Sequence, residues 1–156
     1  PLIRVMPNVA ATVGQSMTAL TACRTSDAQV DAVRDLMNSV GRTILIDEDY
    51  FPVFQALASC SPAWYFQIID TFARAGLKYG LSKDSAVEIA AQAMAGAATL
   101  LLAEREAGTI PAQLIDRVTS PGGTTIAGLL AAEEGGLSTA LVGAVDASIH
   151  ADSHLG

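Results

Sequence analysis

Positive charge is scarce in this sequence. Its 156 residues include 9 lysines and arginines against 16 aspartates and glutamates, which gives a formal net charge of -7 at neutral pH. Nucleic acids select basic surfaces, because much of their affinity for proteins comes from neutralised phosphates. The charge balance therefore argues against nucleic acid as a partner.

Cysteine is also rare, and the two that occur lie far apart. Neither Cys23 nor Cys60 has a nearby cysteine or histidine at the spacing of a zinc site or a redox pair. We expect two reduced thiols, mostly buried, as is usual for free cysteine. His150 and His154 share a helix face with Asp146, a spacing that can bind metal. Because these residues lie near the end of the sequence, where a helix frays, we expect that they bind no metal.

Apolar runs of clear membrane-spanning length are missing. The longest uncharged helical stretch, residues 89–103, is too short for a bilayer and is diluted by Gln92 and Gly96, so it is interpreted as a buried helix. The start of the sequence lacks the basic, apolar and small-residue order of a signal peptide. These features predict no membrane partner and favour the cytoplasm.

A phosphate-binding Gly-x-Gly-x-x-Gly loop is absent as well. Three short β-prone runs are nevertheless present, at residues 2–6, 17–23 and 42–46. Between the second and the third, Ser26 and Gln29 form a capping box, and apolar residues then recur at helical spacing up to Gly41. This strand, helix, strand order resembles the tail of a doubly wound α/β domain.

Helical patterns fill the sequence from residue 49 almost to its end. Clusters of proline, glycine and serine predict breaks at residues 61–62, 76–82, 108–111, 120–123 and 135–136, which delimit five or six helices. The helix from about residue 82 to residue 107 is apolar or small on every face in its middle, so it needs cover on all sides. In a domain of this size, such cover indicates a neighbouring chain.

One segment between two helices carries the clearest binding chemistry. Residues 118–126 read VTSPGGTTI. The glycines permit close backbone approach, and the N–H groups that open the next helix are unpaired and partly positive, so a carboxylate or phosphate fits there. Ser120, Thr124 and Thr125 add three hydroxyl donors. Spacing alone leaves open an ordinary helix-helix turn with a serine or threonine cap.

The same segment carries a family resemblance. Residues 118–129, VTSPGGTTIAGL, are similar almost letter for letter to the signature of pyrroline-5-carboxylate reductases. Other family-like stretches follow in the right order: RVMPN at 4–8, VG at 13–14, MTAL at 17–20, SPAW at 61–64, AAQ at 90–92 and GAA at 96–98. The chain resembles the C-terminal half of such an enzyme, with most of the N-terminal Rossmann domain absent.

The resemblance implies a mainly α chain. Residues 1–48 would be the last strand, helix, strand portion of a Rossmann-type domain, and residues 49–156 an all-helical dimerisation and substrate-binding domain. The full-length protein would reduce 1-pyrroline-5-carboxylate to L-proline with NADPH or NADH, the last step of proline biosynthesis. This fragment alone would be inactive, and it would form a homodimer or a larger homo-oligomer through its helices.

The resemblance also implies residue roles. The substrate carboxylate would be cradled by Ser120, Gly123, Thr124 and Thr125. The Thr125 hydroxyl would act as the catalytic donor to the imine nitrogen, which must be protonated or hydrogen-bonded as hydride reaches the carbon. The residues beside the cofactor would be Met6, Pro7 and Asn8, although a plain strand end is an equally good interpretation of those three.

Two departures from the family pattern leave questions open. Where the family commonly reads LSGSGPAY, residues 57–64 read LASCSPAW, so serines replace both glycines. The segment between Gly96 and Pro111 is longer than expected, which leaves open whether Glu104 or Glu106 matches an acidic residue near the substrate. A solvated helix end is a further interpretation of both glutamates.

Two other functions also remain open. The helical domain of a 3-hydroxyacid dehydrogenase would need a lysine base on its long helix, and neither Lys78 nor Lys83 lies at the place inside the helix where that base is expected. A non-catalytic helical oligomerisation module would use the serine-glycine turn only as a cap.

Overall fold

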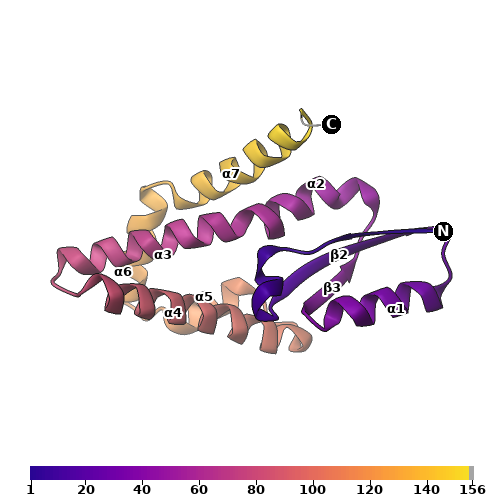
Figure 1. Cartoon of the computed structure of the whole chain (residues 1–156). Coiled ribbons are helices and arrows are strands. Elements are labelled where there is room, and N and C mark those ends of the chain that lie inside the picture. The colour runs from indigo at the N-terminus through magenta and orange to yellow at the C-terminus, as the bar shows by residue number, and fades with distance from the viewer. Residues whose placement is uncertain (155–156) are drawn as a thin grey trace. The chain divides into compact units, whose positions relative to one another are not determined.

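The structure is a computed structural model that describes residues 1–154. It divides into two compact units, and each is described by itself. The first unit comprises Pro1–Trp64 together with the chain from Val142 onward, and the second is Tyr65–Leu141. Figure 1 shows the elements in chain order.

A three-stranded sheet lies in the first unit. Its strands are β1 (Leu2–Met6), β2 (Ser16–Cys23) and β3 (Gly41–Leu45), in that order across the sheet. β1 runs antiparallel to β2, and β2 runs parallel to β3. A parallel pair needs a crossover, which helix α1 (Asp27–Asn38) supplies. The three strands and the helix predicted from the sequence are confirmed.

The start of β3 has room only for glycine. A Cβ atom built on Gly41 would lie 2.1 Å from the carbonyl oxygen of Ser16 and 2.4 Å from its nitrogen. Both are backbone atoms of the neighbouring strand, so no side-chain rotation clears them. The hydroxyl of Ser16 is buried and lies 3.1 Å from the hydroxyl of Thr18. Strands β2 and β3 therefore meet here without any intervening side chain.

The sheet packs against the first helical turns that follow it. The 3-10 turn η2 (Glu48–Tyr50) leads into α2 (Phe51–Phe54) and then into a π-helical segment, η3 (Gln55–Cys60). Phe51, Phe54 and Ala58 form a buried cluster with Ala19 of β2, and Met6 packs against that cluster. Full burial of a phenylalanine contributes about 1.5–3 kcal/mol. This cluster fixes the end of β1 relative to the helix.

The helix continues through Pro62, so the break predicted at residues 61–62 is wrong. Helix α3 (Ser61–Lys78) follows η3 directly. Proline lacks an N–H, and its ring crowds the carbonyl four residues earlier, which here belongs to Ala58. That carbonyl accepts a hydrogen bond from Asn8 Nδ2 at 2.9 Å instead. The wider π turn gives the ring room, which is why the proline does not end the helix.

The second unit is helical. After α3 the chain turns through Gly80 at φ 94, and Ser82 Oγ caps the next helix by accepting from Ser85 N at 3.2 Å. The helices and the 3-10 turn that follow are α4 (Lys83–Glu104), η4 (Arg105–Ala107), α5 (Pro111–Val118), α6 (Thr124–Glu134) and α7 (Leu137–Asp152). Of α7, the part up to Leu141 belongs to this unit and the rest to the first unit. These bounds confirm the predicted helix at residues 82–107 and the other four predicted breaks.

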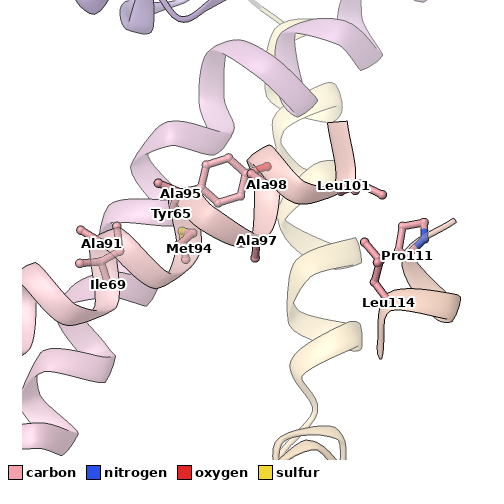
Figure 2. Close-up of a pocket in the computed structure, with 10 residues that line it drawn as sticks. All are labelled: Tyr65, Ile69, Ala91, Met94, Ala95, Ala97, Ala98, Leu101, Pro111 and Leu114. Atoms are coloured by element: carbon pink, nitrogen blue, oxygen red, sulfur yellow. The ribbon is translucent and has the colours of Figure 1, made fainter. Parts of the chain in front are cut away.

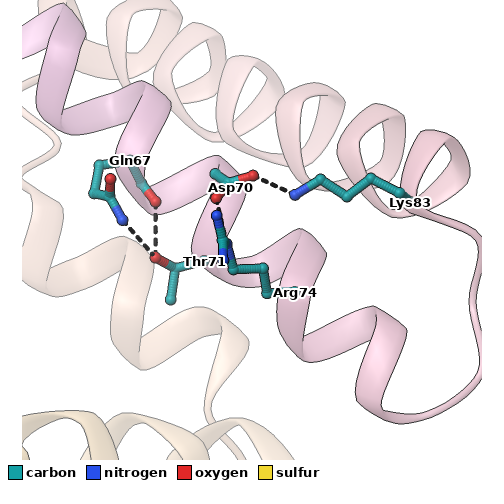
Figure 3. Close-up of polar contacts among 5 residues, drawn as sticks. All are labelled: Gln67, Asp70, Thr71, Arg74 and Lys83. Carbon is teal, nitrogen blue, oxygen red and sulfur yellow. Dashed lines mark hydrogen bonds and ion pairs between the residues drawn. The ribbon is translucent and has the colours of Figure 1, made fainter.

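Helices α3 and α4 are tied together near their connecting turn. Asp70 Oδ2 accepts from Arg74 Nε at 2.6 Å, and Asp70 Oδ1 pairs with Lys83 in the first turn of α4 (Figure 3). The hydrogen bonds from Lys83 and then Arg74 lower the pKa of Asp70 below its usual range. Gly76 permits close helix contact, because a Cβ built on it would lie 2.9 Å from the Cβ of Ala86.

Helix α4 is mostly uncovered in the single chain. With η4 it forms the helix Lys83–Ala107, which by length and composition alone could cross a membrane, and only 6% of its most apolar window is buried. The length argument against a membrane span therefore does not hold, because the helix extends beyond residues 89–103 at both ends. The cover predicted on every face of this helix is likewise absent within the described residues of one chain.

Candidate functional site

The residues predicted to cradle a carboxylate lie at the junction of α5 and α6. The Thr119 hydroxyl donates to the Ile115 carbonyl at 3.0 Å, which closes the end of α5. The chain then turns, with Gly123 N donating to Ser120 O at 2.9 Å and Gly122 at φ 69. Pro121 at the second position and a positive φ at the third are typical of a type II turn. Helix α6 begins directly after this turn.

The first turn of α6 offers backbone donors to a ligand. Gly123 is the N-cap residue, with extended backbone, and no side chain within residues 1–154 caps the helix. The first turn contains no acidic residue, so the positive end of the helix dipole is not compensated there. An anionic group would therefore gain both hydrogen bonds and a favourable field at this point.

The Ser120 hydroxyl lies over this helix start. A Cβ atom built on Gly123 would be 2.4 Å from Ser120 Oγ and 3.1 Å from the Ser120 carbonyl oxygen. The hydroxyl thus occupies the space that a side chain at position 123 would need. Thr124 and Thr125 stand in the first turn, and all three hydroxyl residues are exposed. The four predicted cradle residues thus lie at one helix start, and the three that carry a hydroxyl are exposed.

An ion pair connects this junction to the end of α4. Arg117 Nη1 donates to Glu104 Oε2 at 2.5 Å, and the Thr109 hydroxyl lies 3.3 Å from the same oxygen. The Arg117 guanidinium lowers the pKa of Glu104, and Glu104 in turn raises the pKa of Arg117. Glu104 is therefore already engaged within the chain, whereas Glu106 is exposed in η4.

The three residues predicted to lie beside a cofactor follow the end of β1 in the first unit. Met6 borders the buried cluster, Pro7 is exposed and Asn8 is half-buried. The Asn8 side chain donates to the Ala58 carbonyl, a contact that sequence reasoning missed. Pro62 could have indicated from the sequence that the Ala58 carbonyl needs a donor from elsewhere, because a proline leaves the carbonyl four residues earlier without its helical donor.

Two apolar grooves run along α4 in the second unit. One of about 630 Å³ is bordered by Tyr65 and Ile69 of α3 and by Leu114 of α5 (Figure 2). Another of about 500 Å³ lies beside it, and Met94 and Ala97 of α4 belong to the walls of both. Both grooves are lined almost entirely by apolar side chains, and large apolar residues of the same helix, such as Ile89 and Leu102, are exposed. These grooves suit association with another helix better than they suit a small charged ligand.

A sequence model of pyrroline-5-carboxylate reductase dimerisation matches residues 48–155, a span that contains both α4 and the turn at residues 120–123. The chain belongs to the pyrroline-5-carboxylate reductase family. This assignment confirms the family resemblance and the fold class, a short strand portion followed by a helical dimerisation region. It also supports self-association of the chain.

Members of the family resemble this chain along its whole length. The pyrroline-5-carboxylate reductase of Corynebacterium melassecola is 34% identical over 157 residues, which cover 100% of this chain and 57% of that protein. A solved pyrroline-5-carboxylate reductase from Coxiella burnetii has a TM-score of 0.92 and 31% identity, over 99% of this chain and 57% of that one.

A third relative has been solved with a cofactor. The pyrroline carboxylate reductase of Plasmodium falciparum with NADP bound has a TM-score of 0.88 and 26% identity, over 100% of this chain and 63% of that one. The chain spans about half the length of the curated relatives it matches. These matches favour a pyrroline-5-carboxylate reductase over a 3-hydroxyacid dehydrogenase or a bare oligomerisation module.

The two serines that replace glycines of the family pattern behave differently. Ser61 is buried and donates to the Leu57 carbonyl at 2.6 Å, whereas the buried Ser59 hydroxyl has no hydrogen-bond partner within the described residues. Cys60 between them is half-buried, but Cys23 is exposed at the end of β2. The predicted burial of both thiols is therefore wrong for Cys23.

Proposed function

We propose that the full-length protein containing this chain reduces 1-pyrroline-5-carboxylate to L-proline, the last step of proline biosynthesis. The observation that carries this proposal is the start of α6, where backbone donors and three hydroxyls meet in a chain of the reductase family. A cyclic imino acid has the carboxylate and the imine nitrogen that such a group of donors would hold. The chain alone is expected to be inactive.

The hydride donor in this proposal is NADPH or NADH, and the NADP bound to the Plasmodium falciparum relative supports it. When bound, the nicotinamide supplies the hydride that reaches the imine carbon. The residues of this chain that would lie beside it are Met6, Pro7 and Asn8. Pro7 is exposed and Asn8 half-buried, so a flat ring has access to this strand end.

The substrate would be held by the cradle at the start of α6. Its carboxylate would accept from the Ser120 hydroxyl and from the N–H groups after Gly123, because these donors converge on the uncompensated helix end. The Thr124 hydroxyl stands in the same turn. The Thr125 hydroxyl would hydrogen-bond the imine nitrogen and stabilise the charge that changes there as the carbon is reduced.

Steady-state kinetics on the full-length protein test this assignment. Thr125→Val keeps the side-chain shape but removes the hydroxyl, and we expect kcat to fall about 100-fold, the lower range for general acid catalysis. The matched variant Thr125→Ser keeps a hydroxyl and should retain most of the rate. A Thr125→Val enzyme with wild-type kcat would remove Thr125 from the mechanism.

A second substrate separates the carboxylate site from the nitrogen site. 1-Pyrroline has the imine but no carboxylate, so Ser120→Ala should raise KM for 1-pyrroline-5-carboxylate and leave turnover of 1-pyrroline unchanged. Formation of proline, followed by mass spectrometry, confirms the reaction. Absence of proline from the wild-type reaction with either nicotinamide cofactor would refute the proposed function.

We also propose that the protein is a homodimer or a larger homo-oligomer in the cytoplasm, with α4 covered by a second copy. The dimerisation family and the two apolar grooves support this arrangement. Charged residues such as Glu88 within the helix Lys83–Ala107 favour a protein partner over lipid. The domains would be residues 1–48, from a dinucleotide-binding domain, and residues 49–156, and the start of the family match at residue 48 supports that boundary.

A further inference from the structure

Asn8 uses both ends of its side-chain amide within the first unit. Its Oδ1 accepts from Ala10 N at 3.3 Å and from Met17 N at 3.4 Å, and its Nδ2 donates to the Ala58 carbonyl at 2.9 Å. Its own N–H donates to Ser16 Oγ at 3.3 Å. An amide side chain has two donor hydrogens and two acceptor lone pairs, and three of these four are taken. Little of this amide is left for a ligand.

The Ala58 carbonyl needs this donor because of Pro62. Proline has no N–H, so Pro62 leaves the Ala58 carbonyl without a helical donor in the α register of α3, and the Leu57 carbonyl without one in the π register of η3. The Ser61 hydroxyl donates to the Leu57 carbonyl at 2.6 Å, which leaves the Ala58 carbonyl to Asn8. Ala58 is buried, and a buried carbonyl without a partner is costly. The Asn8 amide therefore fills a place in the helix that the proline leaves open, 50 residues along the sequence.

The segment that Asn8 holds has little other support. The 3-10 turn η1 (Val9–Val13) begins directly after it and contains no buried residue, and Val9 and Val13 are 60% and 73% exposed. Apolar packing therefore fixes Met6 on one side but not the turn on the other. The Asn8 side chain ties the start of this turn to β2 through Met17 N and to the π-helical segment through the Ala58 carbonyl.

We propose that Asn8 is a positioning residue, which holds Met6 and Pro7 against the π-helical segment through the Ala58 carbonyl so that they can contact the nicotinamide cofactor. This inference rests on the proposed function. It assigns Asn8 an indirect role, because the side chain acts through the backbone of its neighbours. π-Helical segments are frequent at functional sites, which agrees with a role for η3 beside the cofactor.

The test uses the full-length protein and the variant Asn8→Ser. Serine is a good N-cap residue and keeps an acceptor for Ala10 N, but its side chain is too short to reach the Ala58 carbonyl. We expect KM for the nicotinamide cofactor to rise about fivefold, the factor that one hydrogen bond typically contributes. KM for the imine should change less than about twofold, because the cradle at α6 is untouched.

A second substitution separates positioning from stability. Pro62→Ala restores an N–H that can donate to the Ala58 carbonyl within the helix, so the thermal stability lost in Asn8→Ser should return in Asn8→Ser/Pro62→Ala. The raised cofactor KM should persist in the double variant, because the side chain of residue 8 still makes no hydrogen bond to the Ala58 carbonyl and Met6 and Pro7 are not held in place. Pro62→Ala alone is the matched control and should keep the wild-type KM.

Three results would overturn the inference. A cofactor KM that is unchanged in Asn8→Ser would show that the contact does not position the cofactor residues. A cofactor KM that returns to the wild-type value together with stability in the double variant would show a merely structural role. An inactive wild-type protein would overturn this inference and the proposed function together, whereas the first two results leave that function intact.

Discussion

Replacing Gly123 by alanine would test whether the Ser120 hydroxyl donates a hydrogen bond to the substrate carboxylate. Gly123 has φ -75 and ψ 165, which alanine adopts without strain, so the effect comes only from the added methyl group. That methyl carbon would lie 2.4 Å from Ser120 Oγ, about 1 Å inside normal contact, and the hydroxyl must rotate away from the helix start. The turn itself needs less adjustment, because the carbonyl of Ser120 would be 3.1 Å away.

The size of the effect follows from the hydrogen bond that is lost. A hydrogen bond to a charged group contributes about 1.5–3 kcal/mol, so displacing the hydroxyl should raise KM for 1-pyrroline-5-carboxylate at least about tenfold. The assay is steady-state kinetics of the full-length protein with saturating nicotinamide cofactor. The double variant Ser120→Ala/Gly123→Ala should have the same KM for 1-pyrroline-5-carboxylate as Ser120→Ala alone, because the hydroxyl that the added methyl group would displace is already absent.

Gly122→Ala is the matched control for this experiment. Gly122 has φ 69, and nothing lies within 4 Å of a Cβ built there, so alanine would strain the backbone without displacing the Ser120 hydroxyl. Such strain costs about 1–2 kcal/mol and should lower the melting temperature. Equal KM values for Gly122→Ala and Gly123→Ala, or additive losses in the Ser120→Ala/Gly123→Ala variant, would refute the reasoning.

The remaining predictions concern the helical unit. The pKa of Asp70 is lowered in the folded state, so its contribution to stability is complete above its unfolded pKa of about 4 and is lost as pH falls towards the folded value. In denaturant unfolding, the free energy of unfolding of Asp70→Asn should therefore fall less than that of the wild type as pH is lowered below about 4. The same pH dependence in the variant and the wild type would contradict this prediction. Ala97→Arg places a charge in the wall shared by both grooves and should shift the protein towards monomer in size-exclusion chromatography. Ala28→Arg, on the exposed face of α1, should leave the elution volume unchanged, and equal elution of all three proteins would argue against association through α4.

The sequence predicted most elements, because their signals are local. Alternating apolar residues, the serine before α4 and the glycines after helices each act within a few positions, and the structure has strands and helix ends where they indicate. The junction at residues 120–123 was also predictable, since its proline, glycines and hydroxyls are contiguous.

The helix through Pro62 was not predictable in the same way. The Ala58 carbonyl, which Pro62 leaves without its helical donor, is satisfied by Asn8, which lies 50 residues before Ala58 and reaches it only after the sheet has packed on the helix. No local pattern contains that contact. The exposure of α4 concerns the single chain that the structure describes, and it agrees with the proposed association of two copies through this helix.

The composition of α4 has a consequence for the cost of assembly. The share of the groove walls that α4 contributes is mostly alanine, such as Ala90, Ala93, Ala97 and Ala98, whereas longer side chains such as Tyr65 and Phe72 come from α3. Alanine has no rotamer freedom to lose, so covering the alanines of α4 restricts no side-chain motion there. A small apolar area can then hold two chains together as well as a larger one that must first order flexible residues.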